Sequence, residues 1–267
     1  MPVYKTIIVY LCIMLIPARV TIAQNQVLGK IDRAILSSDA NPMYLDFWPL
    51  VAKAWQRIGI RPTLALIAPA TVTVDESLGD VIRFEPIEGV STALYAQVIR
   101  LFLPAYFEED VCILSDIDML PINKEYYLKD IINLPRNSFV VYRESLVDGS
   151  PRYSMCYNVA CGKTFKEIFT IEATKQSIIN TVIAWSKLGL GWNTDEIMLY
   201  NTLFSWQGYK SRCIKLGHQV ERRIDRGNWI YDAEKLKNNY YIDSHMIRPY
   251  SHYKIEIDKL AVLLNIT

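Results

Sequence analysis

Two aspartates separated by one residue, Asp116 and Asp118, follow the short apolar run Val111 to Leu114. In an extended chain, residues two apart point to the same side, so both carboxylates can face one ligand. Two such carboxylates repel each other unless a cation lies between them, and oxygen ligands favour Mg²⁺ or Mn²⁺. A cation held there can bind a diphosphate and neutralise the charge that develops as it leaves. The structural alternative is a pair of turn or capping aspartates.

His245 is the histidine that could complete such a metal site. An imidazole added to two carboxylates favours Mn²⁺ over Mg²⁺. The chain has only three histidines, although a lone histidine is more often an ordinary core or surface residue than a ligand. Arg248 and Lys254 are the nearby cations that could face a diphosphate, with ordinary surface charge as the alternative for each.

A second acidic pair, Asp195 and Glu196, is predicted in the first turn of a helix that Asn193 could cap. Acids at this position stabilise a helix by about 0.3–1 kcal/mol, so the pair has a purely structural explanation. The functional explanation is a carboxylate directed at a sugar or at the acceptor of a sugar. The residues by themselves leave both explanations open.

Charge and cysteine content exclude several classes of function. Lys plus Arg number 29 and Asp plus Glu 28, and a net charge of +1 gives no electrostatic reason to expect a nucleic-acid partner. The densest basic cluster, Arg222-Arg223 with Arg226, is interpreted as a solvated face. Five cysteines without a CxxC pair fit neither a zinc ribbon nor a disulfide framework.

Three nucleotide- or metal-binding motifs also fail on inspection. Leu120 and Pro121 stand where a calcium-binding EF-hand loop needs an oxygen ligand and a glycine. Gly162-Lys163-Thr164 is similar to the end of a P-loop, but Tyr157 occupies the position of its first glycine. No GxGxxG sequence follows a predicted strand, so a dinucleotide-binding fingerprint is absent.

Residues 1–25 form a predicted signal-like or anchor-like extension. A lysine precedes the apolar run at residues 7–16, which is typical of a signal peptide and shorter than the roughly 20 residues of a membrane span. Any membrane association is expected through residues 7–16 only. The protein is expected to be cytoplasmic if residues 1–24 are not a signal, and otherwise secretory or membrane-anchored.

Strands and helices are predicted to alternate within a single domain at residues 26–267. Strands are expected at residues 31–36, 63–67, 81–84, 111–114, 139–142 and 155–160, and helices at 48–58, 91–103, around 178–185 and from 194. This alternation predicts an α/β fold, a mainly parallel central sheet with helices on both faces. Ligands bind such sheets beyond the carboxyl ends of the strands, where the turns at residues 38–41 and 116–118 are expected.

The order of these motifs resembles the GT-A glycosyltransferases, over about residues 31–250. In that family a helix carrying an arginine, here Arg100, precedes the strand that ends in DxD. The turn at residues 38–41 is similar to the loop that holds the nucleobase, and the segment at residues 194–199 to the acidic helix near the donor sugar. The resemblance extends to the small GT-A domains of large algal DNA viruses and, more distantly, to retaining galactosyltransferases.

The resemblance implies a role for each matching residue. Mn²⁺ or Mg²⁺ would be ligated by Asp116, Asp118 and His245. The catalytic candidates are Asp195, Glu196 and Arg100. The residues implied to contact the nucleotide sugar are Ser38, Asp39, Asn41, Tyr95, Arg100, Asp116 and Arg248. Ser251 stands where the retaining galactosyltransferases carry a lysine, which leaves the phosphate contact open between Arg248 and Lys254.

The predicted function is metal-dependent transfer of a hexose-type sugar from a nucleoside-diphosphate sugar, with UDP favoured, to a hydroxyl acceptor expected on a glycan. If the reaction inverts the anomeric centre, a carboxylate acts as general base, and Asp195 is the candidate. If it retains configuration, Asp195 or Glu196 positions the sugar, and the sequence leaves this choice open. The alternatives are an inactive nucleotide-sugar-binding protein and a sugar nucleotidyltransferase, whose usual Gly-rich basic loop is absent from residues 37–42.

Overall fold

The computed structural model describes residues 26–144, 151–218 and 220–266. The signal-like extension predicted at residues 1–25 therefore lies outside the described residues. Within the described ranges, no helix has both the length and the apolar character required to cross a membrane.

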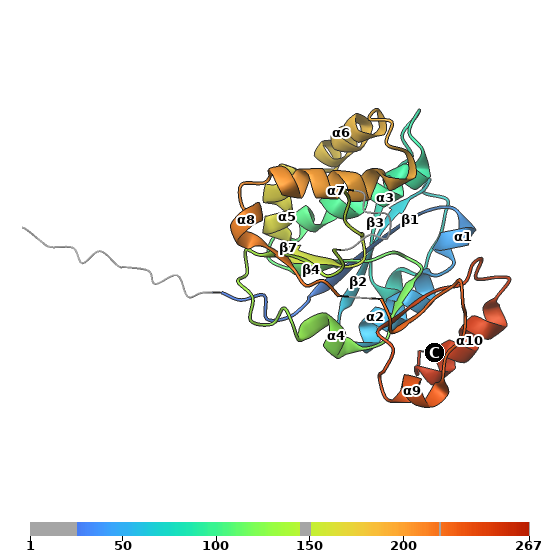
Figure 1. The fold of residues 1–267 in the computed structure, drawn as a ribbon. Helices are drawn as coiled ribbons and strands as arrows, with labels where there is room; N and C mark the ends of the chain where they lie inside the picture. Colours follow the sequence, from blue (N-terminus) through green and yellow to red (C-terminus); the bar gives the residue numbers. More distant parts are fainter. Residues whose placement is uncertain (1–25, 145–150, 219, 267) are drawn as a thin grey trace, which may run out of the picture.

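A seven-stranded sheet forms the centre of the molecule (Figure 1), with strand order β3-β2-β1-β4-β7-β6-β8. Its strands are β1 (Arg33–Asp39), β2 (Arg61–Ile67), β3 (Asp80–Phe84), β4 (Val111–Leu114), β6 (Phe139–Val141), β7 (Asn158–Cys161) and β8 (Cys213–Lys215). All neighbouring pairs are parallel except the two that involve β7, which runs against β4 and β6. The mainly parallel sheet predicted from the sequence is confirmed.

Helices cover both faces of this sheet, as predicted for the α/β class (Figure 1). One face carries α3 (Thr92–Phe102), α5 (Gly162–Phe169), α6 (Lys175–Ser186), α7 (Thr194–Ser205) and α8 (Tyr209–Arg212). The other carries α2 (Trp48–Arg57), α4 (Lys124–Leu128), α9 (Ala233–Lys237) and α10 (Lys254–Leu263), while α1 (Pro42–Leu45) follows the end of β1. Strand side chains alternate between the two cores: Ala34 and Leu36 pack on the α2 side and Ile35 on the α3 side.

A second, three-stranded sheet lies beyond the end of β4. It contains β5 (Met119–Pro121), β9 (Arg223–Ile224) and β10 (Asp243–His245) in the order β5-β10-β9. Strand β5 begins directly after Asp118, and its first residue, Met119, pairs with His245 at the end of β10. The pairing of these two short strands is therefore what carries His245 to the DxD turn.

One buried carboxylate, that of Asp243 in β10, anchors the small sheet. Its oxygens accept hydrogen bonds from Arg143 at 2.7 Å, from Arg223 of β9 at 2.8 Å and from the Tyr157 hydroxyl at 2.9 Å. Burial opposes ionisation, but the two guanidinium groups outweigh it and lower the pKa of Asp243 to about 2. Because this one buried carboxylate pairs with both guanidinium groups, its removal would leave two cations without their common partner.

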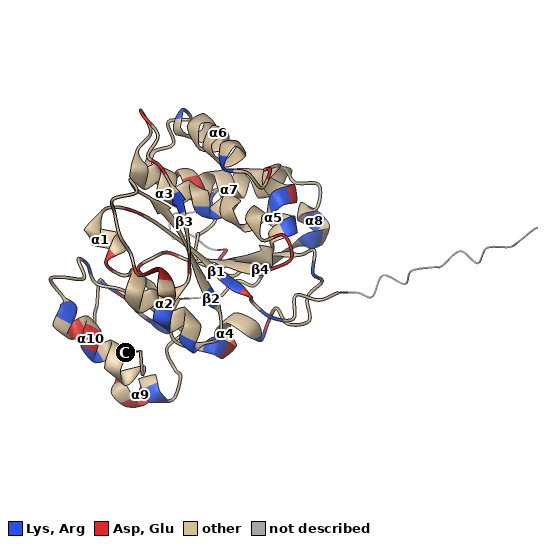
Figure 2. Ribbon diagram, turned by 180° about the vertical axis from the view of Figure 1, so that it is seen from behind, with Lys and Arg blue, Asp and Glu red and all other residues tan. Residues whose placement is uncertain are grey.

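Charged side chains of both signs are interspersed on the outer helices. Figure 2 shows Lys and Arg beside Asp and Glu along α5 and α10. Each of these two helices therefore carries both positive and negative side chains, as the composition of the whole chain does.

Candidate active site

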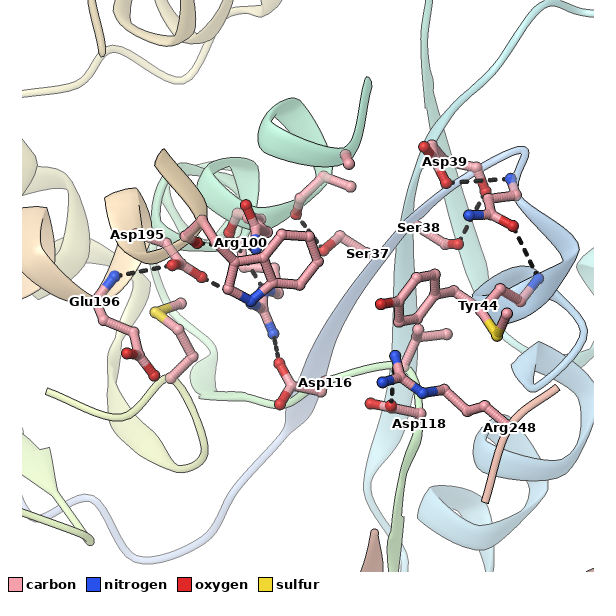
Figure 3. A pocket seen from close by; sticks show the side chains of 18 of the residues that line it. Ser37, Ser38, Asp39, Tyr44, Arg100, Asp116, Asp118, Asp195, Glu196 and Arg248 are labelled. Carbon is pink, nitrogen blue, oxygen red and sulfur yellow. Dashed lines mark hydrogen bonds and ion pairs between the residues drawn. The ribbon is translucent and has the colours of Figure 1, made fainter. Parts of the chain in front are cut away.

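A cavity of about 530 Å³ opens beyond the carboxyl ends of β1 and β4. Segments far apart in the chain line it, among them the end of β1 with the turn after it, α3, the DxD turn, the first turn of α7 and the end of β10 with the residues after it. Figure 3 shows labelled side chains from several of these segments around the cavity. Every predicted site residue except Tyr95 lines this cavity, namely Ser38, Asp39, Asn41, Arg100, Asp116, Asp118, Asp195, Glu196, His245 and Arg248. The structure thus brings together residues from almost the whole domain.

Tyr95 does not belong to the cavity. Its side chain is fully buried and packs edge-to-face on Phe84, with ring centroids 5.9 Å apart. Arg100 and Tyr95 lie on different sides of α3, so Arg100 reaches the cavity while Tyr95 points into the core. Tyr95 therefore has a packing role, and the predicted contact between Tyr95 and the nucleotide sugar is wrong.

The turn after β1 forms one end of the cavity. Asp39 accepts hydrogen bonds from the Asn41 amide at 3.1 Å and from the Thr92 hydroxyl at 2.8 Å. Asn41 in turn caps α1 through the Met43 amide at 3.0 Å. These bonds hold the turn in shape while both residues remain on the cavity wall, so the capping role and a nucleobase-binding role are compatible.

Arg100 connects the DxD turn to the acidic helix (Figure 3). Its guanidinium, only 5% exposed as a residue, contacts the carboxylate of Asp116 and lies 3.0 Å from the nearer carboxylate oxygen of Asp195. Burial works against the charge of Asp116, yet the paired Arg100 prevails and lowers its pKa to about 2. Arg100 thus fixes the spacing between the two acidic segments.

The two acids of α7 have different environments. Asp195 is 3% exposed, paired with Arg100 and hydrogen-bonded to the Glu196 amide at 2.9 Å. Burial raises the pKa of Asp195, against the opposing pull of Arg100. Asn193 stands at the N-cap position, but its side chain makes no capping bond, so the capping predicted for it is wrong.

Glu196 is the more accessible acid of the two, with its side chain 23% exposed and a carboxylate oxygen 3.6 Å from the Arg152 guanidinium. Partial burial, followed by repulsion from Asp195, raises the pKa of Glu196 to about 7 despite the pull of Arg152. A carboxyl group with such a pKa can exchange a proton near neutral pH. Asp195, by contrast, is placed to orient Arg100.

Asp118 is surrounded by cationic side chains. Its residue is 4% exposed, and its carboxylate lies 3.2 Å from Arg226, 3.5 Å from Arg248 and 3.6 Å from the Nε2 of His245. Arg226 was expected on a solvated face, and its side chain is 37% exposed, but the turn after β9 also brings its guanidinium to Asp118. Arg223 of the same cluster departs from that expectation, because it is 15% exposed and pairs with the buried Asp243. The guanidinium of Arg248 also lies over the Tyr44 ring, 4.7 Å from its centroid.

The side chains that could ligate a divalent metal are present in the cavity, but they do not surround a single point. Within residues 26–144, 151–218 and 220–266, no three His, Cys, Asp or Glu side chains are close enough together to hold a metal ion. Asp116, Asp118 and His245 nevertheless line one cavity, and Asp118 and His245 are in contact. The chemistry of two carboxylates and an imidazole suits Mn²⁺, and the residues fit such an ion in type, although they are not gathered around one point.

Comparison with known proteins gives structural similarity only. No protein-family model matches the sequence, and no curated protein matches it. The galactosyltransferase LgtC, solved with donor and acceptor sugar analogues, is 14% identical, with a TM-score of 0.49 and alignment over 87% of this chain and 95% of that one. The glycosyltransferase GlyE of Streptococcus pneumoniae TIGR4 is 14% identical with a TM-score of 0.49; 88% of this chain aligns with 62% of the GlyE chain. For the bifunctional glycosyltransferase WbbM the identity is 13% and the TM-score 0.43, and 89% of this chain spans 50% of that one.

The geometry also distinguishes the two residues that were candidates for binding a phosphate group. Arg248 lines the cavity. Lys254 does not, because it pairs with Asp258 in the first turns of α10 and lies 3.4 Å from the Tyr250 hydroxyl. Arg248 is therefore the better placed of the two to meet an anionic ligand.

Two cavity residues, Arg226 and Trp192, were missed by the sequence interpretation. Arg226 belongs to the densest basic cluster of the chain, and that density was its only signal. Trp192 directly follows Gly191, two residues beyond Gly189, just after the point where the preceding helix was expected to stop. A bulky aromatic inside a Gly-rich connection is the signal that could have identified it.

Proposed function

We propose that this protein is a metal-dependent glycosyltransferase that moves a hexose-type sugar from a nucleoside-diphosphate sugar to a hydroxyl acceptor. One observation carries the proposal: a single cavity joins the turn after β1, the DxD turn with its cations and the acidic first turn of α7. An elongated ligand with a base, a negatively charged centre and a sugar has chemistry that matches these three regions in order.

Each region has a distinct task in this proposal. Asp39 and Asn41 bind the nucleobase, while Arg226 and Arg248 bind the diphosphate. Asp116, Asp118 and His245 would hold Mn²⁺ or Mg²⁺, which supplies positive charge to the departing diphosphate. Arg100 and Asp195 orient the sugar-binding wall.

Glu196 is the carboxylate that faces the reacting sugar in this proposal. In an inverting reaction it takes the proton of the acceptor hydroxyl. In a retaining reaction it positions the donor sugar or stabilises the positive charge that develops on it.

A substrate screen tests the proposal directly. The protein is incubated with Mn²⁺ and a panel of nucleotide sugars or nucleoside triphosphates, and release of nucleoside diphosphate or pyrophosphate is measured. Slow hydrolysis of one nucleotide sugar to its nucleoside diphosphate is expected. Binding without any turnover would favour the inactive nucleotide-sugar-binding protein, and pyrophosphate release from a triphosphate would favour the nucleotidyltransferase.

We predict that Mn²⁺ binds weakly to the protein alone and at least about tenfold more tightly when UDP is present. The reason is that the carboxylate of Asp118 is already paired with Arg226 and Arg248, whereas a diphosphate would draw these guanidinium groups away and add its own oxygens as ligands. Titration calorimetry with and without UDP measures both affinities. Equal Mn²⁺ affinities in the two titrations would contradict the shared-ligand arrangement.

We predict that Arg226→Ala has opposite effects on the two ligands. Loss of a charge-assisted contact should weaken UDP binding about tenfold, while Mn²⁺ alone should bind more tightly because Asp118 loses a competing partner. Arg222→Ala is the matched control, since Arg222 lies over the Tyr240 ring outside the cavity. The assignment fails if uridine, which has no phosphate, loses as much affinity as UDP in Arg226→Ala.

A further inference from the structure

Trp192 is the exposed aromatic side chain of the cavity. It is 64% exposed and lines the same cavity as Asp195 and Glu196. Among the described residues its indole has no recorded hydrogen bond or ring contact. An indole exposed on the wall of a cavity presents a flat apolar face on which a ring of a ligand can stack.

The backbone around Trp192 is held in place although its ring is free. Gly189 and Gly191 have φ values of 67° and 66°, the left-handed region that glycine adopts without strain. The Gln97 side chain of α3 donates to the Trp192 carbonyl at 3.1 Å, and the Thr194 hydroxyl donates to the Gly191 carbonyl at 2.7 Å. These contacts hold the Trp192 backbone at the cavity wall, while its side chain stays exposed there.

We infer that Trp192 is the stacking platform for the acceptor, and that the acceptor carries a pyranose ring. This inference rests on the proposed function. The nearly buried Arg100 and Asp195 form the inner wall, where the donor sugar would lie. Trp192 lies at the outer wall, where a molecule that enters after the donor would meet it. The C–H bonds on one face of a pyranose form an apolar surface that matches an indole face, while the hydroxyl groups at the ring edge remain free to meet Glu196.

The test compares Trp192→Ala with Trp192→Phe and with Phe204→Ala. Phe204 is the matched control because it is 63% exposed and lies on α7, stacked on Tyr200 and outside the cavity. Binding of methyl β-D-galactopyranoside and methyl β-D-glucopyranoside is measured by NMR titration of the protein saturated with UDP and Mn²⁺. UDP affinity and hydrolysis of the nucleotide sugar without acceptor are measured in parallel.

Trp192→Ala is expected to weaken pyranoside binding at least about tenfold, with partial recovery in Trp192→Phe and no change in Phe204→Ala. Its UDP affinity and donor hydrolysis should stay within about twofold of the wild-type values. Unchanged pyranoside binding in Trp192→Ala, an equal loss in Phe204→Ala, or an equal loss of UDP binding would overturn the inference. A wild-type protein that hydrolyses no donor but binds pyranosides through Trp192 would refute the proposed function and support the platform.

Discussion

Asp118→Asn is expected to abolish metal-dependent donor binding. The substitution removes the negative charge of a residue that we propose as a direct metal ligand, while it keeps the size of the side chain. Loss of a supporting residue costs about 10–100-fold in metal affinity, so loss of a ligand should cost more than about a hundredfold. Titration with UDP in the presence and absence of Mn²⁺ measures the effect, and Mn²⁺ should no longer increase UDP affinity.

The control for this experiment is Asp258→Asn, the same chemical change outside the cavity. Asp258 pairs with Lys254 on the surface of α10, so its loss should leave UDP binding unchanged. Melting curves of both variants are needed, since Asp118 is buried among cations and its neutralisation also lowers stability. If a folded Asp118→Asn protein still showed Mn²⁺-stimulated UDP binding, Asp118 would not be a ligand.

Glu196→Gln is expected to lower turnover by about 10²–10⁴-fold while UDP affinity stays unchanged. Glutamine keeps the shape and the hydrogen-bonding capacity of the side chain, but it can neither accept a proton nor stabilise positive charge. In the wild-type protein the rate should increase with pH through about 7, where Glu196 ionises. A pH–rate profile of both proteins, with acceptor present, measures this difference.

Glu196→Gln should also change the free energy of unfolding, in a direction that follows from the pKa of Glu196. The folded protein raises the pKa of Glu196 above the ordinary value of 4.5. Glu196 therefore contributes stability below pH 4.5, and this contribution is lost as pH increases through about 7. Because glutamine stays neutral, Glu196→Gln should be more stable than the wild-type protein above pH 7, by on the order of 1–3 kcal/mol. Wild-type turnover together with an unchanged melting curve at pH 8 would rule out both the catalytic role and the buried environment.

Asp195→Asn is a less clear test, because it is expected to lower both catalytic activity and stability. Removal of one partner from a buried ion pair costs about 3–5 kcal/mol. Asp116 keeps part of the pairing of Arg100, so we expect a smaller loss. The sequence suggested a helix-end acid whose neutralisation costs little, but the burial of Asp195 against Arg100 changes that expectation. Glu196, which is more exposed than Asp195 and lies 3.6 Å from Arg152, is the better position for a kinetic test.

Local patterns were sufficient to predict the central sheet and one part of the site. The apolar run Val111 to Leu114 is strand β4 with the predicted bounds, and Asp116 and Asp118 face one cavity at its end. Strand and helix signals are local, because side-chain alternation and helical spacing depend on neighbours along the chain.

The small sheet could not be predicted in the same way. Its strands have two or three residues each, too few to show alternation. Strand β10 pairs with β5 across more than 100 residues of sequence and with β9 across about 20. The arrival of Arg226 at Asp118 depends on that pairing, so its cluster with Arg222 and Arg223 resembled surface charge. Only the resemblance to a family, and not spacing, had linked His245 to the DxD turn.

The arrangement of the site depends on the buried carboxylate of Asp243, which lies outside the cavity. The turn after β9 and the end of β10 bring Arg226 and His245 to the carboxylate of Asp118, and Asp243 is the charge that binds both strands to the interior. The relative positions of the guanidinium proposed to bind phosphate and the imidazole proposed to bind metal therefore depend on a fully buried residue outside the cavity. A neutral residue at position 243 would appear in a binding assay as a lost ligand site, and evolution can alter donor affinity there without changing one contact to the donor.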